Sequence, residues 1–93
     1  MIKSFRDDRA ESIFDRRYVR DLGHDVQRAA YRKLVQLDAA VRLDDLRIPP
    51  GNRLEALSGR RKGQRSIRVN DQWRICFVWR GGDAYDVEIV DYH

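Results

Sequence analysis

The sequence predicts an α+β fold in which an N-terminal strand and two helices precede an antiparallel β-meander. Apolar residues recur at helical spacing in the first half of the chain, over residues 8–19 and 25–41. Stretches of alternating apolar and polar residues follow at 65–70, 73–80 and 85–91. Helices grouped before strands predict two layers, with both helices on one sheet face and the other face open and polar. The 93 residues predict one domain, 1–93, with a small core.

The N-terminal segment predicts a short strand and then a first helix. Ile2 and Phe5 are the apolar positions of residues 1–6 and are available for a core. Asp7 and Asp8 offer an N-cap, and acidic side chains in the first helical turn interact favourably with the helix dipole. Apolar residues then recur at helical spacing to about residue 19, and Gly23 breaks the helix.

The second predicted helix, residues 25–41, has the clearest period in the chain. Its apolar stripe recurs at steps of three and four residues and consists of Val26, Ala30, Leu34, Leu37 and Val41, widened by Ala29 and Val35. Polar side chains lie off this stripe, as they do in an amphipathic helix. A partner-binding helix has the same pattern, but packing on a core explains such a stripe more commonly.

The second half begins with loops and ends in strands. Two prolines and a glycine in residues 47–52 predict a rigid turn. Residues 53–57 are ambiguous, and residues 58–63 form a glycine-bounded loop with three consecutive cations. The strands then alternate, and their predicted apolar face holds Ile67, Val69, Trp73, Ile75, Phe77, Trp79, Tyr85, Val87 and Ile89.

The positive charge is concentrated in one segment. Lysine and arginine number 19 and aspartate and glutamate 15, so the net charge is +4. Residues 1–46 carry ten basic and nine acidic side chains (+1), residues 47–80 nine and two (+7), and residues 81–93 none and four (−4). Such a cationic block indicates an anionic partner, although a solvated basic surface has the same composition.

Composition disfavours several classes of protein. Cys76 is the single cysteine, so an internal disulfide and a cysteine-based zinc site are excluded, and a reducing compartment, the cytoplasm, is expected. No apolar run is long enough to predict a membrane span, and the charged first 20 residues do not resemble a signal peptide. Metalloprotease and nucleotide-binding motifs are absent, and we expect neither a metal nor another cofactor.

The open face of the predicted sheet combines arginines with groups that exchange protons. Arg68 and Arg74 flank a hairpin turn, and Asp91, Tyr92 and His93 end the last strand. Metal-free RNA cleavage needs a base for the ribose 2′-hydroxyl, positive charge for the phosphorane and an acid for the 5′-oxygen. On residue types alone, a solvated terminal histidine, an ordinary strand tyrosine and a surface arginine are the commoner interpretations. Further cations come from the preceding loop and strand edge: Arg53, Arg60, Arg61, Lys62 and Arg65.

Four stretches resemble the HigB toxins of the RelE/ParE superfamily, of the host-inhibition or plasmid-maintenance killer type. They are Met-Ile-Lys-Ser-Phe (1–5), Pro-Pro-Gly-Asn-Arg-Leu-Glu-Ala-Leu-Ser-Gly (49–59), Ser-Ile-Arg-Val-Asn-Asp-Gln-Trp-Arg-Ile-Cys-Phe (66–77) and Val-Glu-Ile-Val-Asp-Tyr-His (87–93). The resemblance implies a RelE-like fold and a type II toxin that cleaves translated mRNA in the ribosomal A site without a metal. It implies as partners a HigA-type helix-turn-helix antitoxin, the ribosome with its 16S rRNA, and mRNA, with operator DNA reached only through the antitoxin.

The resemblance also implies roles for single residues. Arg74, of the Trp-Arg pair, corresponds to the stabiliser of the phosphate or transition state, and Tyr92 to a stacking or proton-transfer group. Asp91 and His93 correspond to acid–base or positioning groups. Some relatives have a histidine where this chain has Glu55, so Glu55 is expected to replace it as general base, held anionic by nearby arginines. A solvated loop carboxylate is the alternative, and the division of acid and base roles between Glu55 and His93 stays open.

Two other functions are compatible with the same sequence. ParE-like members of the superfamily share the fold but bind and poison DNA gyrase, and they generally lack the acid–base set. The terminal Asp91, Tyr92 and His93 therefore favour the nuclease. A non-catalytic RNA-binding module is the third interpretation, and it would leave messages intact.

Overall fold

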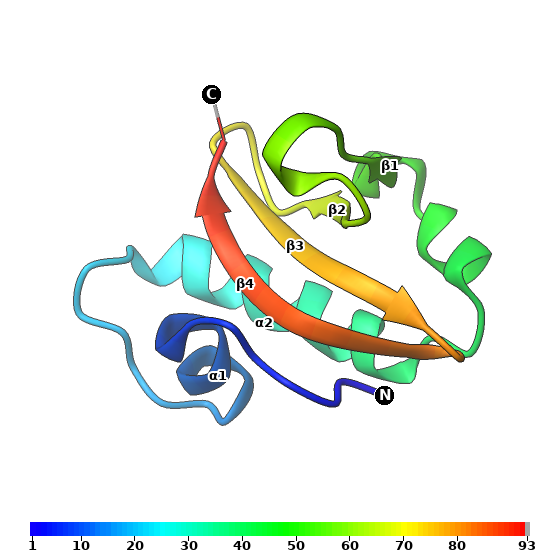
Figure 1. Ribbon diagram of the computed structural model, residues 1–93. Helices are drawn as coiled ribbons and strands as arrows, with labels where there is room; N and C mark the ends of the chain where they lie inside the picture. The colour runs from blue at the N-terminus through cyan, green and yellow to red at the C-terminus, as the bar shows by residue number, and fades with distance from the viewer. Residues whose placement is uncertain (93) are drawn as a thin grey trace.

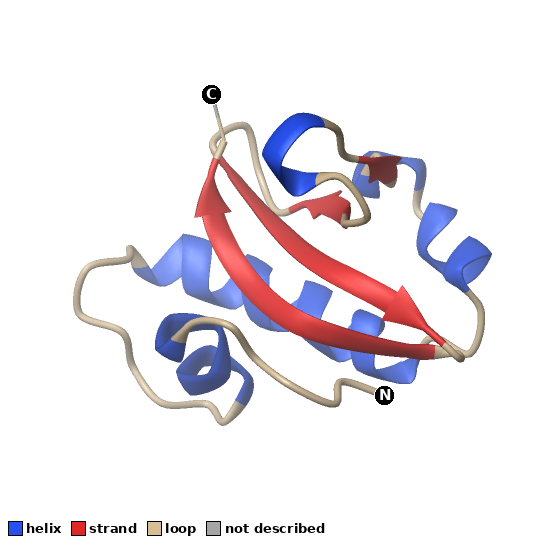
Figure 2. Ribbon diagram, in the orientation of Figure 1, coloured by secondary structure: helices blue, strands red, loops and turns tan. Residues whose placement is uncertain are grey.

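Two helices pack against one face of an antiparallel sheet (Figures 1 and 2). The structure is a computed structural model and describes residues 1–92. The helices are α1 (Asp8–Phe14) and α2 (His24–Ala39), and the strands are β1 (Glu55–Ala56), β2 (Arg65–Arg68), β3 (Trp73–Arg80) and β4 (Asp83–Asp91). Short 3₁₀ helices lie between α2 and β2, namely η1 (Leu43–Arg47), η2 (Pro50–Asn52) and η3 (Gly59–Arg61). The antiparallel order β1-β2-β3-β4 confirms the predicted α+β class and meander.

The hydrophobic core lies between the sheet and the helices. Ile75 and Phe77 of β3 and Val87 of β4 are fully buried, and they pack with Leu34 of α2 and Ile13 of α1. Burying a side chain of this size contributes roughly 1.5–3 kcal/mol relative to leaving it exposed. The sheet face that meets the helices is therefore the apolar face predicted for β2 and β3.

Helix α1 begins as predicted but ends earlier. The Asp7 side chain caps it by accepting a hydrogen bond from the Ala10 amide at 2.6 Å. The helix ends at Phe14 rather than near residue 19, because Arg16 adopts a left-handed conformation with φ 62°. The Arg16 amide donates to the Ile13 carbonyl and the Arg17 amide to the Ser12 carbonyl, which is the hydrogen-bond pattern of a Schellman motif. Glycine usually occupies this position, so an arginine there left no signal in the sequence.

Helix α2 confirms the central part of its predicted stripe. Ala30, Leu34 and Leu37 are buried. Val35, placed at the edge of the stripe, is 41% exposed, and Val41 is 75% exposed because the helix ends two residues before it, at Ala39. Among residues 1–92, no helix is long and apolar enough to cross a membrane.

The predicted N-terminal strand is present only as two isolated parallel bridges to β4. Ile2 bridges to Ala84 and Phe5 to Val87. The bridges are interrupted because β4 carries a bulge between their two attachment points, where Asp86 has a positive φ of 54°. The N-terminal segment still covers the free edge of β4, as Figure 1 shows.

The same bulge moves one side chain to the other sheet face. Val78 pairs with Tyr85 and Cys76 with Glu88, so β4 places one extra residue between these two pairs. Tyr85 therefore leaves the apolar face on which the alternation predicted it, and Ala84 occupies the buried position instead. The Tyr85 ring then contacts the Arg80 guanidinium, which lies 4.5 Å from its centroid.

The sheet face opposite the helices is partly covered, although an open face was predicted. Ser66, Arg74 and Cys76 lie on it and are all buried. Arg61, from η3, forms an ion pair at 3.1 Å with Glu88, which is the residue paired with Cys76 in the sheet. The loop after β1 therefore closes over the middle of this face, and only its ends remain accessible.

Burial makes the single thiol unreactive in the folded protein. The Cys76 side chain is 0% exposed, and burial raises the pKa of its thiol, so the reactive thiolate is disfavoured near neutral pH. We expect a thiol-specific reagent to label Cys76 only after denaturation. A Ser58→Cys variant, with its new thiol on an exposed loop, is the matched positive control. Rapid labelling of the native wild-type chain would contradict the buried placement.

Candidate active site

A polar cleft opens on the sheet face opposite the helices, at the end of the β2–β3 hairpin. Its volume is about 300 Å³, and its lining consists of Arg53, Arg68, Asn70, Asp71, Arg74 and Tyr92. Arg68 and Arg74 pair directly across β2 and β3, so their side chains share this face as predicted. We call this depression the Arg74 cleft.

Arg74 is held rigidly at the base of the cleft. Its Nε donates to the Ser66 hydroxyl at 2.9 Å, and its Nη2 donates to the Arg53 carbonyl at 2.7 Å. The same Nη2 lies 3.2 Å from Glu55 Oε1, and the Arg74 side chain is only 8% exposed. Its Nη1 makes no hydrogen bond or ion pair with any of residues 1–92, so it remains a donor for a ligand in the cleft.

A buried asparagine fixes the loop that supplies the Arg53 carbonyl. Asn52 is 0% exposed, and its Nδ2 donates to the Leu46 carbonyl and to Gln36 Oε1, each at 3.1 Å. Its Oδ1 accepts from Lys33 of α2. Arg53 itself adopts a left-handed conformation with φ 47° after η2. Asn52 thus anchors the loop to α2, and sequence reasoning missed it because its partners are distant in the chain.

Glu55 lies beside the cleft on β1, opposite Ser66. Its carboxylate is half exposed and pairs with Arg74, so a carboxylate and a guanidinium meet at the position where cleavage chemistry was predicted. Because the Glu55 carboxylate touches the Arg74 guanidinium, it can accept a proton from a substrate group that lies beside the phosphate bound by Arg74. The structure thus brings Glu55 and Arg74 together.

The tight turn between β2 and β3 forms the rim of the cleft. Asn70 Oδ1 accepts the amides of Gln72 and Trp73, each at 2.8 Å, which is an Asx turn. Arg68 pairs with Asp71 of this turn. Asn70 was predicted only as a strand residue, and its part in shaping the turn was not anticipated.

Tyr92 closes the cleft from the end of β4. Its amide donates to the Gln72 carbonyl at 2.6 Å, and its ring centroid lies 5.2 Å from the Arg74 guanidinium carbon. The ring is 43% exposed, so one side rests on Arg74 while the other is available to a ligand. This contact supports the predicted association of Tyr92 with Arg74.

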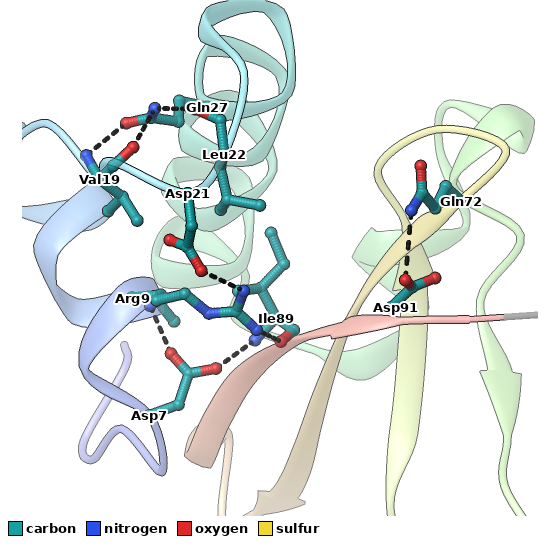
Figure 3. A network of polar contacts seen from close by, with 10 residues as sticks. Asp7, Arg9, Val19, Asp21, Leu22, Gln27, Gln72, Ile89 and Asp91 are labelled. Atoms are coloured by element: carbon teal, nitrogen blue, oxygen red, sulfur yellow. Dashed lines mark hydrogen bonds and ion pairs between the residues drawn. The ribbon is translucent and has the colours of Figure 1, made fainter.

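Asp91 does not line the cleft. It pairs with Trp73, whereas Arg74 pairs with Val90, so the Asp91 side chain points to the opposite sheet face. Its Oδ2 accepts a hydrogen bond from Gln72 Nε2 at 3.2 Å (Figure 3). The prediction that Asp91 lies beside Arg74 on the same sheet face is therefore wrong, because successive side chains of a pleated strand point to opposite faces. Asp91 instead contacts Gln72, in the turn whose backbone also binds Tyr92.

The end of β4 is also held from the helical side. Asp7 Oδ2 accepts the Ile89 amide at 3.0 Å, and Arg9 donates to the Ile89 carbonyl at 3.4 Å (Figure 3). Arg9 further pairs with Asp21 at 3.3 Å and lies over the Trp73 ring. Asp7 and Arg9 thus supply hydrogen-bond partners for the Ile89 backbone shortly before Tyr92. This fixes the direction in which Tyr92 leaves the sheet.

The remaining predicted cations are spread over different surfaces. Arg60 and Lys62 are exposed on the loop around η3, and Arg61 is engaged with Glu88 and Gln64. Arg65 pairs with Phe77, so it lies on the opposite side of the sheet from Arg74, which corrects its assignment to the open face. His93, the last predicted site residue, lies outside the described residues.

The Arg74 cleft has the properties of a phosphate-binding site. Arg53, Arg68 and Arg74 come from three different segments and converge on one depression. Guanidinium groups bind phosphate through paired donors and cannot lose their charge at neutral pH. The cleft can therefore hold a phosphodiester beside a carboxylate, Glu55, and a phenol, Tyr92.

Solved structures share this fold. A crystal structure of a YafQ mutant from Escherichia coli matches with a TM-score of 0.64 over 98% of this chain and 93% of that chain, at 13% identity. The YoeB–YefM complex from Staphylococcus aureus matches with a TM-score of 0.57 over 100% of this chain and 98% of that chain, at 14% identity. At these identities the likeness concerns the fold alone. The class of protein that the fold and site define is a small two-layer α+β protein with an arginine-lined cleft beside a carboxylate.

Sequence relatives identify the family. The chain is 46% identical to Toxin HigB-1 of Vibrio cholerae over 86 residues, which is 90% of each chain. It is 36% identical to Endoribonuclease HigB of Proteus vulgaris over 98 alignment positions, covering 100% of each chain. Residues 3–93 match the family described as RelE-like toxin of type II toxin-antitoxin system HigB, so this chain belongs to the HigB-like toxins.

Proposed function

We propose that this chain is a ribosome-dependent mRNA endonuclease that inhibits translation and growth. The observation that carries the proposal is the buried, pre-oriented Arg74 guanidinium at the base of a three-arginine cleft. Family membership and a relative named Endoribonuclease HigB support the same activity. We take residues 1–93 as one toxin domain that acts in the cytoplasm.

The proposed reaction uses only side chains of this chain. Glu55 accepts the proton of the ribose 2′-hydroxyl, and the resulting oxygen attacks the adjacent phosphorus. Arg74 stabilises the phosphorane charge through Nη1, while Arg53 and Arg68 hold the flanking phosphates. The bond from phosphorus to the 5′-oxygen breaks, and that oxygen takes a proton from Tyr92 or His93, which leaves a 2′,3′-cyclic phosphate and a 5′-hydroxyl. Asp91 has a positioning role through Gln72.

The proposed partners follow from the family. A type II toxin is controlled by a protein antitoxin. We propose that the antitoxin is a HigA-type helix-turn-helix protein and that operator DNA is contacted only through it. YoeB of the same fold was solved in complex with YefM. The ribosome, with its 16S rRNA at the A site, presents the mRNA.

Mapping RNA ends after induction tests the proposed activity. After induction of the wild-type chain, we expect new mRNA 5′ ends within translated reading frames. The same messages without their start codons are not translated, and they should show no new 5′ ends. A DNA-damage response without new mRNA ends would favour the ParE-like gyrase function instead. Bound but intact messages would indicate a non-catalytic RNA-binding module.

The exposed cations of the η3 loop are expected to supply salt-dependent affinity. In an Arg60→Gln/Lys62→Gln variant, the slope of log K against log salt for small ribosomal subunits should become shallower by roughly 1–2. Arg61 is left intact because its ion pair with Glu88 gives it a structural role. A Lys3→Gln/Arg80→Gln variant has the same change in charge elsewhere and is expected to keep the slope. Equal slopes in the wild type and the Arg60/Lys62 variant would contradict this role.

A further inference from the structure

A second cleft lies on the helical layer, between α2 and the loop that follows α1. Its volume is about 420 Å³. Ile13 and Tyr31 line it, and four arginines surround them, namely Arg16, Arg17, Arg28 and Arg32. The helices pack on one face of the sheet (Figure 1). The Arg74 side chain lies on the other face, so this helical-face cleft and the Arg74 cleft are on different sides of the sheet.

The arginine rim is only partly neutralised. Arg17 pairs with Asp15 and Arg28 with Asp25, both on the surface. Arg16 and Arg32 have no carboxylate partner among residues 1–92. The Arg16 guanidinium instead lies 4.7 Å from the Tyr31 ring centroid, and the left-handed backbone at Arg16 directs the loop there. The Arg16 and Arg32 guanidinium groups therefore lie beside the apolar surface of the cleft with no carboxylate among residues 1–92 to neutralise them.

The outer wall of this cleft is aromatic and firmly held. Tyr18 is 63% exposed, and its ring contacts the His24 ring in a tilted arrangement, with centroids 5.0 Å apart and an angle of 36° between the ring planes. Gln27 of α2 binds the loop behind it through both the Val19 amide and carbonyl, at 2.9 and 2.8 Å, and the Leu22 carbonyl, at 2.7 Å (Figure 3). A large exposed ring on a tethered loop offers contact area at low entropic cost.

The chemistry of the helical-face cleft fits an acidic protein segment better than RNA. Within the described part of the chain, no carboxylate lines it, and its floor is aliphatic and aromatic, whereas the lining of the Arg74 cleft is mostly polar. Residues 1–46 carry a net charge of only +1, so this side lacks the extended positive field that attracts a polyanion. Short-range pairing of arginine with carboxylate beside an apolar anchor suits an amphipathic peptide.

We propose that the helical-face cleft binds an acidic, amphipathic segment of the antitoxin, with an apolar side chain against Ile13 and Tyr31 and carboxylates on Arg16 and Arg32. This inference rests on the antitoxin part of the proposed function. It adds a docking surface and the chemistry of its occupant, and it is independent of the cleavage chemistry at Arg74.

Calorimetric titration with the HigA-type antitoxin of the proposed function tests the assignment. We expect Arg16→Gln/Arg32→Gln to weaken antitoxin binding by roughly tenfold or more, and Tyr18→Ala, which removes only an exposed ring, to weaken it by a similar factor. Lys3→Gln/Arg80→Gln is the control with the same change in charge, and its affinity should stay within about twofold. Thermal melts of all variants verify folding.

Two further measurements separate the alternatives. Affinity for a short poly(U) oligonucleotide should be unaffected in Arg16→Gln/Arg32→Gln; loss of RNA binding with antitoxin affinity unchanged would overturn the proposal in favour of an RNA site. Antitoxin affinity unchanged in both cleft variants would also overturn it. Message cleavage is measured in parallel, so an inactive wild type that still binds antitoxin through this cleft would reject only the nuclease function.

Discussion

An Arg74→Lys variant is expected to lose mRNA cleavage by roughly 100-fold or more, the scale seen when one preorganised donor to a developing oxyanion is removed. Lysine keeps the positive charge but not the planar fork. It cannot bond the Ser66 hydroxyl and the Arg53 carbonyl together while also presenting a donor to the phosphate. Quantified 5′ ends after induction measure the loss.

The choice of lysine separates chemistry from folding. Arg74→Ala would also relieve growth inhibition, but it leaves the buried Ser66 hydroxyl and the part-buried Arg53 carbonyl without their donor, at a cost of about 1–3 kcal/mol for the buried hydroxyl. Arg80→Lys, an exposed position on the same strand, is the matched control and should retain wild-type cleavage. Full cleavage by Arg74→Lys, with an unchanged melting temperature, would remove Arg74 from the proposed site.

A Tyr92→Phe variant is expected to lower cleavage by roughly 100-fold, the lower range for removal of a general acid. The phenyl ring keeps its place over the Arg74 guanidinium, and the Tyr92 amide keeps its bond to Gln72, so folding and Arg74 orientation are preserved. Only the hydroxyl is lost. Single-turnover cleavage on programmed ribosomes provides the rate.

A comparison of two substitutions distinguishes stacking from proton transfer. If Tyr92 only stacks on the substrate, Tyr92→Phe should be nearly as active as the wild type, and Tyr92→Ala should be impaired. If the hydroxyl donates the proton, both variants should be impaired. Tyr85→Phe, a half-buried strand tyrosine remote from the cleft, controls for general effects of removing a hydroxyl group.

Local patterns predicted much of the architecture correctly. The stripe through Ala30, Leu34 and Leu37 identified α2, and the alternation through Ile75 and Phe77 identified β3, because each follows from a fixed backbone period. The same alternation placed Arg68 and Arg74 together. Their direct pairing across the hairpin confirms that placement.

The errors arose where one residue broke the local period. Arg16 ends α1 in a left-handed conformation that sequence preference assigns to glycine, and Asp86 inserts a bulge that reverses the facing of Tyr85. Neither residue type signals its conformation. Asp86 is held there by a segment distant in the chain, through the bond from its amide to the Ser4 hydroxyl, whereas Arg16 is held by the local hydrogen bonds of the Schellman motif.

The candidate site divides in the same way. Residue types alone left the commoner, non-catalytic interpretations open, and the resemblance singled out Arg74, Tyr92, Glu55, Asp91 and His93 as candidates. The convergence of Arg74, Tyr92 and Glu55 depends on long-range contacts that no local pattern encodes. The Asn52 anchor places the Arg53 carbonyl, and the pleat of β4 turns Asp91 away from Arg74. Residue types thus define the available chemistry, while strand register and buried hydrogen bonds select the groups that meet.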